Sequence, residues 1–310
     1  MGKTLIIVNP NSANGNTRKI WPVIESAIKR KIGSFDTWWT ERMGHGMELA
    51  RKGAEQGYEL LICVGGDGTN NEIINGLMND DGTPVNPDLA YGLICMGTGG
   101  DFRKTALIPK NFREAADWLP GEKTTRIDVG RMEMTDHQGR RVVRFFGNIT
   151  SLGIGGEVDE RVNNTSKALG GFVSFAWASL TAVATYKNKR VRLILDDERD
   201  LGERKIFAVA VANGQFFGGG MHIAPHANLS DGLFDVIVIG DLTKVDTLRQ
   251  MPKIYTAGHF ACEKVEQYRA KKVTALSDER VLLDVDGEQP GKLPATFIVC
   301  PGALKLKIKD

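Results

Sequence analysis

The sequence predicts a two-part α/β protein, in which a half built on a parallel sheet is followed by a mainly antiparallel half. Up to residue 130, short apolar strands alternate with helical patterns, which is typical of a parallel sheet covered on both faces. After about Arg126, strand-like runs dominate and favour antiparallel pairing. With 310 residues and 42% apolar composition, the chain can bury two cores.

In the first half, apolar runs predict strands at 4–8, 34–40, 60–64 and 89–95. Between these strands, apolar residues recur at helical spacing, first at Trp21, Ile24, Ala27 and Ile28, and then at Met47, Leu49, Ala50 and Ala54. A further amphipathic helix is predicted from Asn70, with Ile73, Ile74 and Leu77 on its buried face. This order of elements predicts a parallel sheet.

In the second half, strands are predicted at 141–146, 191–195, 206–212, 233–239, 281–285 and 295–299. Residues 242–265 predict helices. Residues 168–186 carry no charge and barely reach bilayer length, but their glycines and hydroxyls favour a buried helix or one at a lipid surface over a transmembrane span. No linker separates the halves, so we expect domains at 1–130 and 131–310, a cleft between them, and the last strand packing back on the first domain.

The stretch 61–76 predicts a phosphate-binding loop. An apolar strand ends at Gly65 and Gly66, where bare amides and the start of a helix would stabilise an anion. The loop matches neither the P-loop nor the GxGxxG pattern. Asp67 among such amides would repel phosphate unless a cation bridged them, which indicates Mg²⁺ bound with a nucleotide, and Thr69 adds a hydroxyl donor. Without the acid and the hydroxyl, an ordinary tight αβ connection would be the better interpretation.

A second loop, at 92–103, repeats the order of strand, glycine turn and acid. Both loops would lie at the carboxyl edge of the sheet, so Thr98 and Asp101 could face the same phosphates and metal as Asp67, although Asp101 also fits a helix N-cap. Asn9 and Thr40 end other strands at this edge. Either could contact nucleotide, or could be ordinary strand-end residues.

Two segments of the second half carry polar residues that fit either a structural or a functional role. Residues 212–233 form a glycine-dense stretch in which Asp231 and Gly232 suit a β-turn, and its histidines lack partners for a metal. Residues 283–288 place alternate acids on a strand face before Glu288. Either a solvated hairpin tip or a catalytic base fits this pattern.

Bulk properties exclude several classes of protein. The net charge of +2 and the pI near 8.3 are far from those of a nucleic-acid binder, though a mildly basic face could contact an anionic membrane. Cys63, Cys95, Cys262 and Cys300 show no metal spacing and indicate a reducing compartment. Since no signal peptide is evident, we expect a cytoplasmic protein.

The chain resembles the diacylglycerol kinase catalytic family, which includes sphingosine and ceramide kinases, and its soluble bacterial lipid kinases in particular. The resemblance spans nearly the whole length. Its motifs are Asn9-Pro-Asn-Ser, Gly65-Gly-Asp-Gly-Thr, Asn71-Glu-Ile-Ile-Asn, Gly97-Thr-Gly-Gly-Asp-Phe, Asp128-Val-Gly, Gly218-Gly-Gly-Met, the stretch 225–232 and Asp286-Gly-Glu. It implies a Rossmann-like nucleotide-binding domain of the NAD kinase/diacylglycerol kinase type, a C-terminal β-sandwich and an active site between them.

The resemblance also implies roles for residues. ATP and Mg²⁺ would be bound by the first loop and its neighbours, namely Asn9, Thr40, Gly65, Gly66, Asp67, Gly68, Thr69, Asn71 and Thr98. Asp101 and Asp128 would complete an acidic magnesium network, Glu288 would be the general base, and Asp286 would lie beside it. A separate structural Mg²⁺ site would be formed by Asp231 with the carbonyls of Asn228 and Leu233. The partner would be a lipid at the inner membrane face, contacted transiently, with a homodimer compatible with the sequence.

The chain departs from the family pattern at two positions. Gly100 stands where the family usually has Asn, and Ala13 where a Gly usually follows the Ser. Two alternatives to an ATP- and Mg²⁺-dependent lipid kinase remain open. One is a soluble-acceptor kinase of the NAD kinase type, which resembles this chain less because it lacks the Asn71-Glu-Ile-Ile-Asn-Gly continuation. The other is a non-catalytic nucleotide or lipid sensor.

Overall fold

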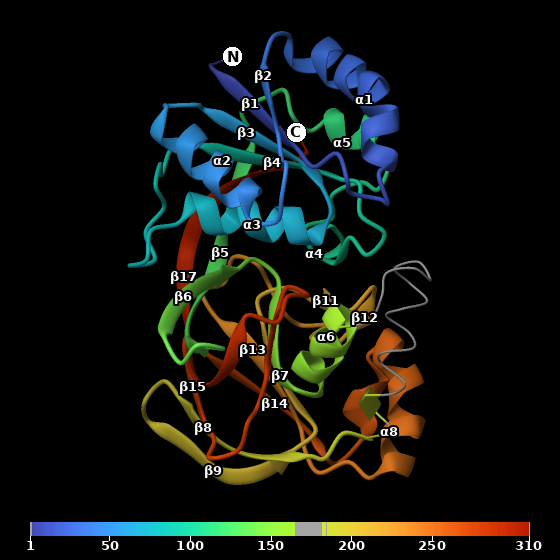
Figure 1. The fold of residues 1–310 in the computed structure, drawn as a ribbon, viewed down its shortest axis with the longest axis vertical. Helices are drawn as coiled ribbons and strands as arrows, with labels where there is room; N and C mark the ends of the chain where they lie inside the picture. The colour runs from blue at the N-terminus through green and yellow to red at the C-terminus, as the bar shows by residue number, and fades with distance from the viewer. Residues whose placement is uncertain (1, 165–181, 184, 310) are drawn as a thin grey trace.

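The computed structural model describes residues 2–164, 182–183 and 185–309, which form two halves stacked along the long axis of the molecule (Figure 1). The α/β half and the β-rich half follow one another as predicted. The uncharged segment predicted to be a helix at 168–186 falls mostly outside the described residues.

The first half contains four parallel strands in the order β2-β1-β3-β4. Their bounds are β1 (Thr4–Val8), β2 (Asp36–Trp39), β3 (Leu60–Gly65) and β4 (Ala90–Cys95). Strand β1 is buried along its length because helices cover both faces of the sheet. The strand order reverses between β1 and β3, which is where ligands collect in sheets of this type.

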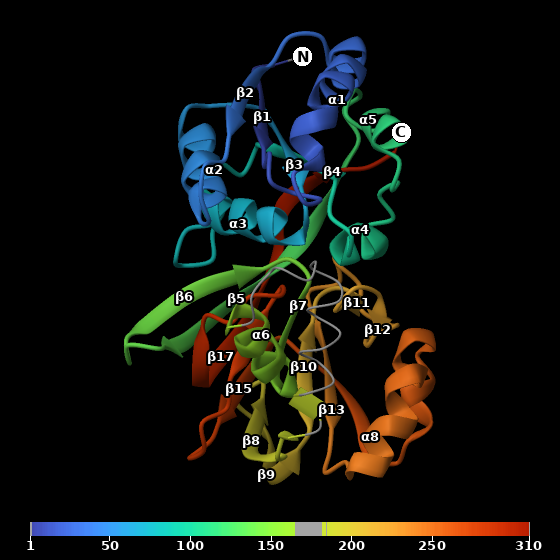
Figure 2. The same ribbon diagram turned by 45° about the vertical axis from the view of Figure 1, so that its right-hand side comes forward.

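Five helices accompany these strands, namely α1 (Asn16–Ile32), α2 (His45–Glu55), α3 (Asp67–Leu77), α4 (Asp101–Thr105) and α5 (Phe112–Ala116). Helices α1 and α5 pack together on one face of the sheet, and α2 and α3 on the other (Figure 2). The prediction that α3 starts at Asn70 was wrong. The helix starts at Asp67, because Gly66 serves as its N-cap and an acid in the first turn is favourable at the positive end of the helix dipole.

The second half is a sandwich of two mainly antiparallel sheets. One is the five-stranded sheet β14-β13-β10-β7-β16, and the other is the lower part of a ten-stranded sheet that ends in β17-β15-β8-β9 and also holds β5 and β6. The bounds are β5 (Thr124–Asp136), β6 (Arg141–Phe146), β7 (Ile149–Gly153), β8 (Lys189–Leu195), β9 (Arg199–Ile206), β10 (Ala208–Ala212), β13 (Phe234–Ile239), β14 (Val265–Ala270), β15 (Lys272–Leu276), β16 (Leu283–Val285) and β17 (Gly291–Lys307).

The core of the sandwich is made by alternate residues of the facing strands. Phe146 of one sheet stacks on Phe234 of the other with ring centroids 5.5 Å apart, and Met132 and Phe297 are also fully buried there. This packing follows from the period of two in the strand sequences.

Strands β5 and β17 pass through both halves. Strand β17 lies between β4 and β15, parallel to the former and antiparallel to the latter, and it pairs with β5 from Thr124 to Asp136. One sheet of ten strands therefore runs the length of the molecule. The domain boundary that we expected between residues 130 and 131 lies inside β5.

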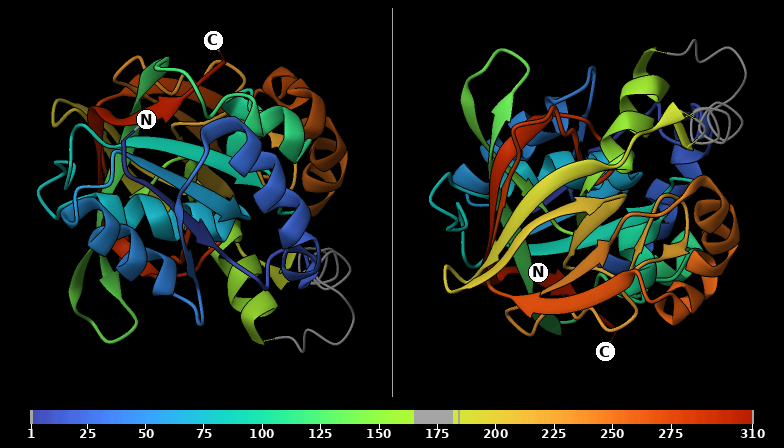
Figure 3. Two further views of the ribbon diagram at one scale, coloured as in Figure 1. Left: turned by 90° about the horizontal axis from the view of Figure 1, so that it is seen from above. Right: turned by 90° about the horizontal axis from the view of Figure 1, so that it is seen from below.

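Short elements complete the second half, namely α6 (Ile154–Asn164), the hairpin β11 (Phe216–Phe217) and β12 (Met221–His222), α8 (Lys244–Gln250), η2 (Met251–Thr256) and η3 (Gly258–Ala261). The helices predicted at 242–265 are confirmed only for α8, because Pro252 and Gly258 follow and the chain continues in 3₁₀ turns. This segment lies at one edge of the second half (Figure 3, right). Among the described helices, none combines the length and apolarity needed to span a bilayer.

Candidate functional site

Three loops of the first half meet at the carboxyl edge of the parallel strands. Asn9 follows β1, and its Nδ2 donates a hydrogen bond of 2.8 Å to Oγ1 of Thr69. Gly66 follows β3 and Gly97 follows β4. A Cβ built on Gly97 would lie 2.8 Å from the Cα of Gly66, so the two loops touch backbone to backbone. Only glycine permits this approach.

The N-terminus of α3 presents unused amides at this edge. Gly66 is the N-cap and supplies no side-chain acceptor, and the amide of Asn70 makes a 3.0 Å bond to the Gly66 carbonyl. Within the described chain, the amides of residues 67–69 bond no acceptor. These donors and the positive end of the helix dipole together form a site for an anion.

Asp67 and Asp101 flank the loop after β4. A Cβ on Gly99 would lie 3.0 Å from Oδ2 of Asp67 and 3.8 Å from Oδ2 of Asp101. Oδ2 of Asp67 accepts the amide of Gly100 at 2.7 Å. Burial, and then the charge of Asp101, raise the pKa of Asp67, while amide donors oppose the shift. The pair thus concentrates negative charge beside the anion site.

Asp101 also connects the first half to the glycine hairpin of the second. Its Oδ2 accepts the amide of Gly219 at 2.7 Å, and its Oδ1 accepts Nζ of Lys104 at 2.8 Å. The three glycines 218–220 all have positive φ, at 59°, 83° and 116°. We did not predict Lys104 or the hairpin contact from the sequence, although three successive glycines were the available signal.

Two neighbouring carboxylates suit Mg²⁺. In proteins this ion is usually held by one or two carboxylates, with substrate phosphates and water completing the octahedron. Among the described residues, no group of three or more His, Cys, Asp or Glu side chains is arranged to hold a metal alone. The donor set of Asp67 and Asp101 therefore fits an ion that arrives with a nucleotide.

Glu288 faces the start of α3 from the second half. A Cβ on Gly68 would lie 4.0 Å from Oε1 of Glu288. In the part of the chain that the structure describes, its carboxylate has no hydrogen-bond partner. Burial, and then the charge of Glu72, raise the pKa of Glu288, and Arg144 opposes them. A half-buried carboxylate without a partner, placed beside an anion site, is suited to accept a proton.

Asp286 is bonded differently from Glu288. Its Oδ2 accepts Nδ2 of Asn71 at 2.8 Å and the amide of Gly147 at 3.1 Å, and its Oδ1 accepts the amide of Ile149 at 2.9 Å. Burial raises its pKa to about 7 against these bonds. Asp286 therefore joins α3 to the second half.

Asn75 makes a second connection between the halves. Its Nδ2 donates to the carbonyl of Phe145 at 2.8 Å, and its Oδ1 accepts the amide of Phe145 at 2.9 Å. Glu72, one residue after Asn71, accepts the amides of Gly44 and Gly46 at the start of α2. We had assigned no role to Glu72 or Asn75, since neither contact has a local sequence signal.

Asp128 has other neighbours than Asp67 and Asp101. It is buried in β5, and its two carboxylate oxygens accept the amides of Gly232 and Gly302, each at 2.7 Å. Burial raises its pKa and the amides oppose this. Its oxygens therefore position two turns, and no described contact joins it to the other two acids.

In the turn at 228–233, the side-chain oxygens that were expected to bind Mg²⁺ or lie beside it already accept hydrogen bonds from other protein groups. Oδ1 of Asp231 accepts the amide of Leu233 at 3.1 Å, and its Oδ2 is bonded by the guanidinium of Arg269. Oδ1 of Asn228 accepts the amide of Ser230 at 3.1 Å. A cation at this turn would compete with Arg269.

The remaining residues lie around the edge. Thr40 is buried and its amide donates to the Val8 carbonyl at 2.9 Å, whereas Thr98 is exposed at the loop tip. The two departures from the family pattern both have left-handed backbones, with φ of 60° at Gly100 and 52° at Ala13. Glycine suits this conformation and alanine does not.

Two models of known domain families match most of the chain. Residues 3–132 match the diacylglycerol kinase catalytic domain, and residues 148–308 match the YegS C-terminal NAD kinase beta sandwich-like domain. A diacylglycerol kinase of Staphylococcus epidermidis is 30% identical over 295 residues, which cover 94% of this chain and 88% of that protein. One from Staphylococcus saprophyticus is 29% identical over 295 residues, covering 94% and 91%.

Solved structures share the fold. The crystal structure of a diacylglycerol kinase from Bacillus anthracis aligns with a TM-score of 0.69 at 21% identity, covering 99% of this chain and 96% of that chain. Yeast NADH kinase complexed with NADH aligns with a TM-score of 0.52 at 11% identity, covering 98% and 78%. At these identities the likeness concerns the fold alone. It confirms the predicted α/β domain and β-sandwich.

Proposed function

Because the chain belongs to the diacylglycerol kinase family, we propose that it transfers the γ-phosphate of ATP to a lipid hydroxyl group, with diacylglycerol or a related lipid as the acceptor. One observation carries the proposal beyond the family. Glu288, which has no partner in the described chain, faces the first turn of α3, where the amides of residues 67–69 are unused. This arrangement supports a proposed base beside a proposed phosphate site.

The nucleotide phosphates would lie at the N-terminus of α3. The amides of residues 67–69, the hydroxyl of Thr69 and the contact between Gly66 and Gly97 support this position, and Gly65 leaves the space that Thr69 fills. Asn9 would orient Thr69 through their hydrogen bond. The same proposal gives Thr40 and Thr98 contacts with the nucleotide.

Asp67 and Asp101 would hold Mg²⁺ together with these phosphates. When bound, the ion would neutralise charge on the phosphate oxygens. Asp128 is proposed as a positioning residue of this network, since its oxygens bind Gly232 and Gly302. For the separate Mg²⁺ site at Asn228, Asp231 and Leu233, the ion would have to displace Arg269 from Asp231.

Glu288 would act as the general base. The acceptor oxygen forms a bond to the γ-phosphorus, the bond from that phosphorus to the bridging oxygen breaks, and ADP leaves. The hydroxyl proton passes to the Glu288 carboxylate. Asp286 would hold the turn that carries Glu288, through its bonds to Asn71, Gly147 and Ile149. Such reactions depend mainly on positioning and charge stabilisation.

A panel of acceptors tests this function against its alternatives. Purified protein is incubated with γ-labelled ATP, Mg²⁺ and either diacylglycerol, sphingosine, phosphatidylglycerol, undecaprenol or NAD. Label in a lipid supports the proposal, label in NAD supports the soluble-acceptor kinase, and label in neither supports a non-catalytic nucleotide or lipid sensor. The Glu288→Ala variant serves as the background control.

Dependence on Mg²⁺ is tested separately. A chelator should abolish transfer, and added Mg²⁺ should restore it. Asp67→Asn should raise the Mg²⁺ concentration needed for half-maximal rate, because one of the two carboxylates is lost. Asp278→Asn, at an exposed acid elsewhere, is the matched control. Full activity of Asp67→Asn at the wild-type Mg²⁺ requirement would remove Asp67 from the metal site.

A further inference from the structure

The segment α8–η2 exposes an unusual amount of apolar surface. Nine large apolar side chains are exposed among the described residues, and four of them lie in this one segment. They are Val245 (54%), Leu248 (63%), Met251 (37%) and Tyr255 (54%). Single exposed apolar residues are ordinary, but a group of four on eleven consecutive residues indicates a contact surface.

Apart from Asp246, which pairs with Lys264, the charged residues of this segment are basic. Arg249 and Lys253 are exposed between the apolar residues, and neither has an ion pair within the described chain. No acidic residue occurs from Thr247 to Cys262. An apolar face bearing unpaired cations is complementary to an anionic lipid surface, where the apolar groups enter the boundary region and the cations meet headgroups.

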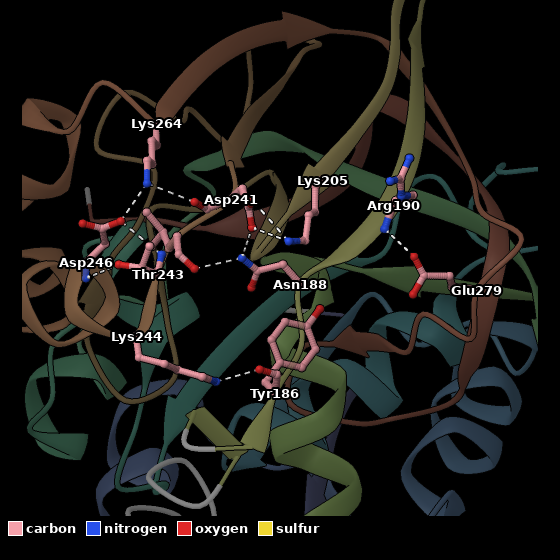
Figure 4. Close-up of polar contacts among 11 residues, drawn as sticks. Tyr186, Asn188, Arg190, Lys205, Asp241, Thr243, Lys244, Asp246, Lys264 and Glu279 are labelled. Carbon is pink, nitrogen blue, oxygen red and sulfur yellow. Dashed lines mark hydrogen bonds and ion pairs between the residues drawn. The ribbon is translucent and has the colours of Figure 1, made fainter.

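The polar groups at the base of the segment are already used (Figure 4). Thr243 and Asp246 form a capping box at the start of α8, and Nζ of Lys264 bonds Asp246 at 2.7 Å. Nζ of Lys244 donates to the carbonyl of Tyr186 at 2.6 Å. The base is therefore fixed to the protein, while the outward residues have no partner in the described structure.

The segment is also connected to the candidate active site. Helix η2 packs against β12, and Nε2 of His259 in η3 is 3.1 Å from the carbonyl of Ile223 just after β12. The β11–β12 hairpin in turn donates the amide of Gly219 to Asp101. A surface bound by α8–η2 would therefore be linked to Asp101 through two successive contacts, the first between η2 and the β11–β12 hairpin and the second between the hairpin and Asp101.

We propose that α8–η2 docks the protein on anionic bilayers through one docking face. This docking face comprises Val245, Leu248, Arg249, Met251, Lys253 and Tyr255. Burial of the apolar side chains at the headgroup boundary and attraction of the two cations both favour binding. Docking would bring the active site to its lipid substrate, and this part of the inference rests on the proposed function. Membrane binding itself requires no catalysis.

Vesicle sedimentation tests the docking face without turnover. The full chain is sedimented with phosphatidylcholine vesicles that contain or lack phosphatidylglycerol, at low and high salt. Wild-type protein should bind the anionic vesicles, and salt should weaken binding. Arg249→Gln with Lys253→Gln should lower the partition coefficient roughly fivefold for each charge removed. Leu248→Ser with Tyr255→Ser should lower it by at least about tenfold.

Val23→Ser with Met43→Ser is the matched control, because these exposed apolar residues, at 46% and 80%, lie outside the docking face. It should bind like wild type, and all variants should keep the wild-type melting temperature. Wild-type binding by both docking-face variants would overturn the proposal, as would a wild type that does not bind.

A dimer on gel filtration that Leu248→Ser with Tyr255→Ser converts to monomer would assign the face to a second copy instead. Vesicle binding without lipid phosphorylation would keep the docking face and reject the function.

Discussion

The side-chain amide of Asn71 donates a 2.8 Å hydrogen bond to Oδ2 of Asp286, and this bond joins the two halves next to the candidate active site. Asn71 lies on α3, whose N-terminus offers the unused amides. Asp286 lies two residues before Glu288. The bond therefore fixes the proposed base relative to the proposed phosphate site.

Asn71→Ala should weaken both the fold and the activity. The substitution removes one donor to Asp286 and one to the Phe145 carbonyl, so these acceptors keep only the bonds from Gly147 and Asn75. The loss of two buried hydrogen bonds should lower the free energy of unfolding by about 1–3 kcal/mol, and kcat should fall because one of the three bonds that position the Glu288 turn is lost. Urea denaturation and steady-state kinetics measure the two effects. The exposed Asn16 serves as control, and an equal effect of Asn16→Ala would refute the assignment.

Asp286 should make stability depend on pH. Its pKa rises from 3.8 in the unfolded chain to about 7 in the fold. The stabilisation that protonated Asp286 gives the fold is therefore complete below the pKa of the unfolded chain, and it is lost as the pH rises through the pKa of the folded protein. Relative to the non-titrating Asp286→Asn variant, wild-type stability should fall between about pH 5 and about pH 7, by at most about 1.4 kcal/mol per pH unit. Urea denaturation of both proteins across this range measures the slope. Parallel profiles of the two proteins would contradict this shift.

Glu288→Gln should lower kcat roughly 10²- to 10⁴-fold, since the amide cannot take the acceptor proton. Stability should not fall, because the raised pKa of Glu288 indicates that its ionised form is disfavoured where it lies. ATP affinity should stay near the wild-type value. The exposed Glu263 provides the control substitution, Glu263→Gln. Retention of wild-type kcat by Glu288→Gln would require another base.

Gly97→Ala should impair nucleotide use. The new Cβ would lie 2.8 Å from the Cα of Gly66, so the two loops must separate. Since displacement of about 1 Å can cost roughly 10²-fold in rate, we expect a loss of that order in kcat/KM for ATP. Gly258→Ala is the control, because a Cβ there has its nearest neighbour at 3.4 Å. Unchanged kinetics for Gly97→Ala would show that the close approach is dispensable.

Ala13→Gly should stabilise the protein by about 1 kcal/mol. Ala13 has φ of 52°, a left-handed conformation that costs a residue with a Cβ more than it costs glycine. Thermal and urea denaturation measure the gain. Ala27→Gly, inside α1, should instead lower the free energy of unfolding by a similar amount. A loss of stability in both variants would mean that residue 13 is not strained.

The sequence was sufficient to predict the parallel strands and the glycine loops. A buried strand that runs directly into glycines has few alternatives, and β3 followed by Gly66 and Asp67 is the clearest case. The start of α3 was missed because a glycine N-cap gives weaker evidence than the asparagines that follow it.

Other features depend on pairing between distant residues. Asp128 binds amides at Gly232 and Gly302, more than one hundred positions away, so its local motif does not reveal those partners. Strands β7, β9, β14 and β15 were not predicted, since short strands are set by their neighbours in the sheet more than by local propensity. The contacts of Asn75 with Phe145 have the same origin.

The position of β17 has a consequence for how the protein is made. Strand β4 pairs with residues near Leu306, which the ribosome adds about two hundred residues after β4 itself. During synthesis the first half therefore emerges with the β4 edge of its sheet unpaired, and this edge stays unpaired until β17 has been made. A chaperone that shields strand edges would find its substrate in this nascent chain.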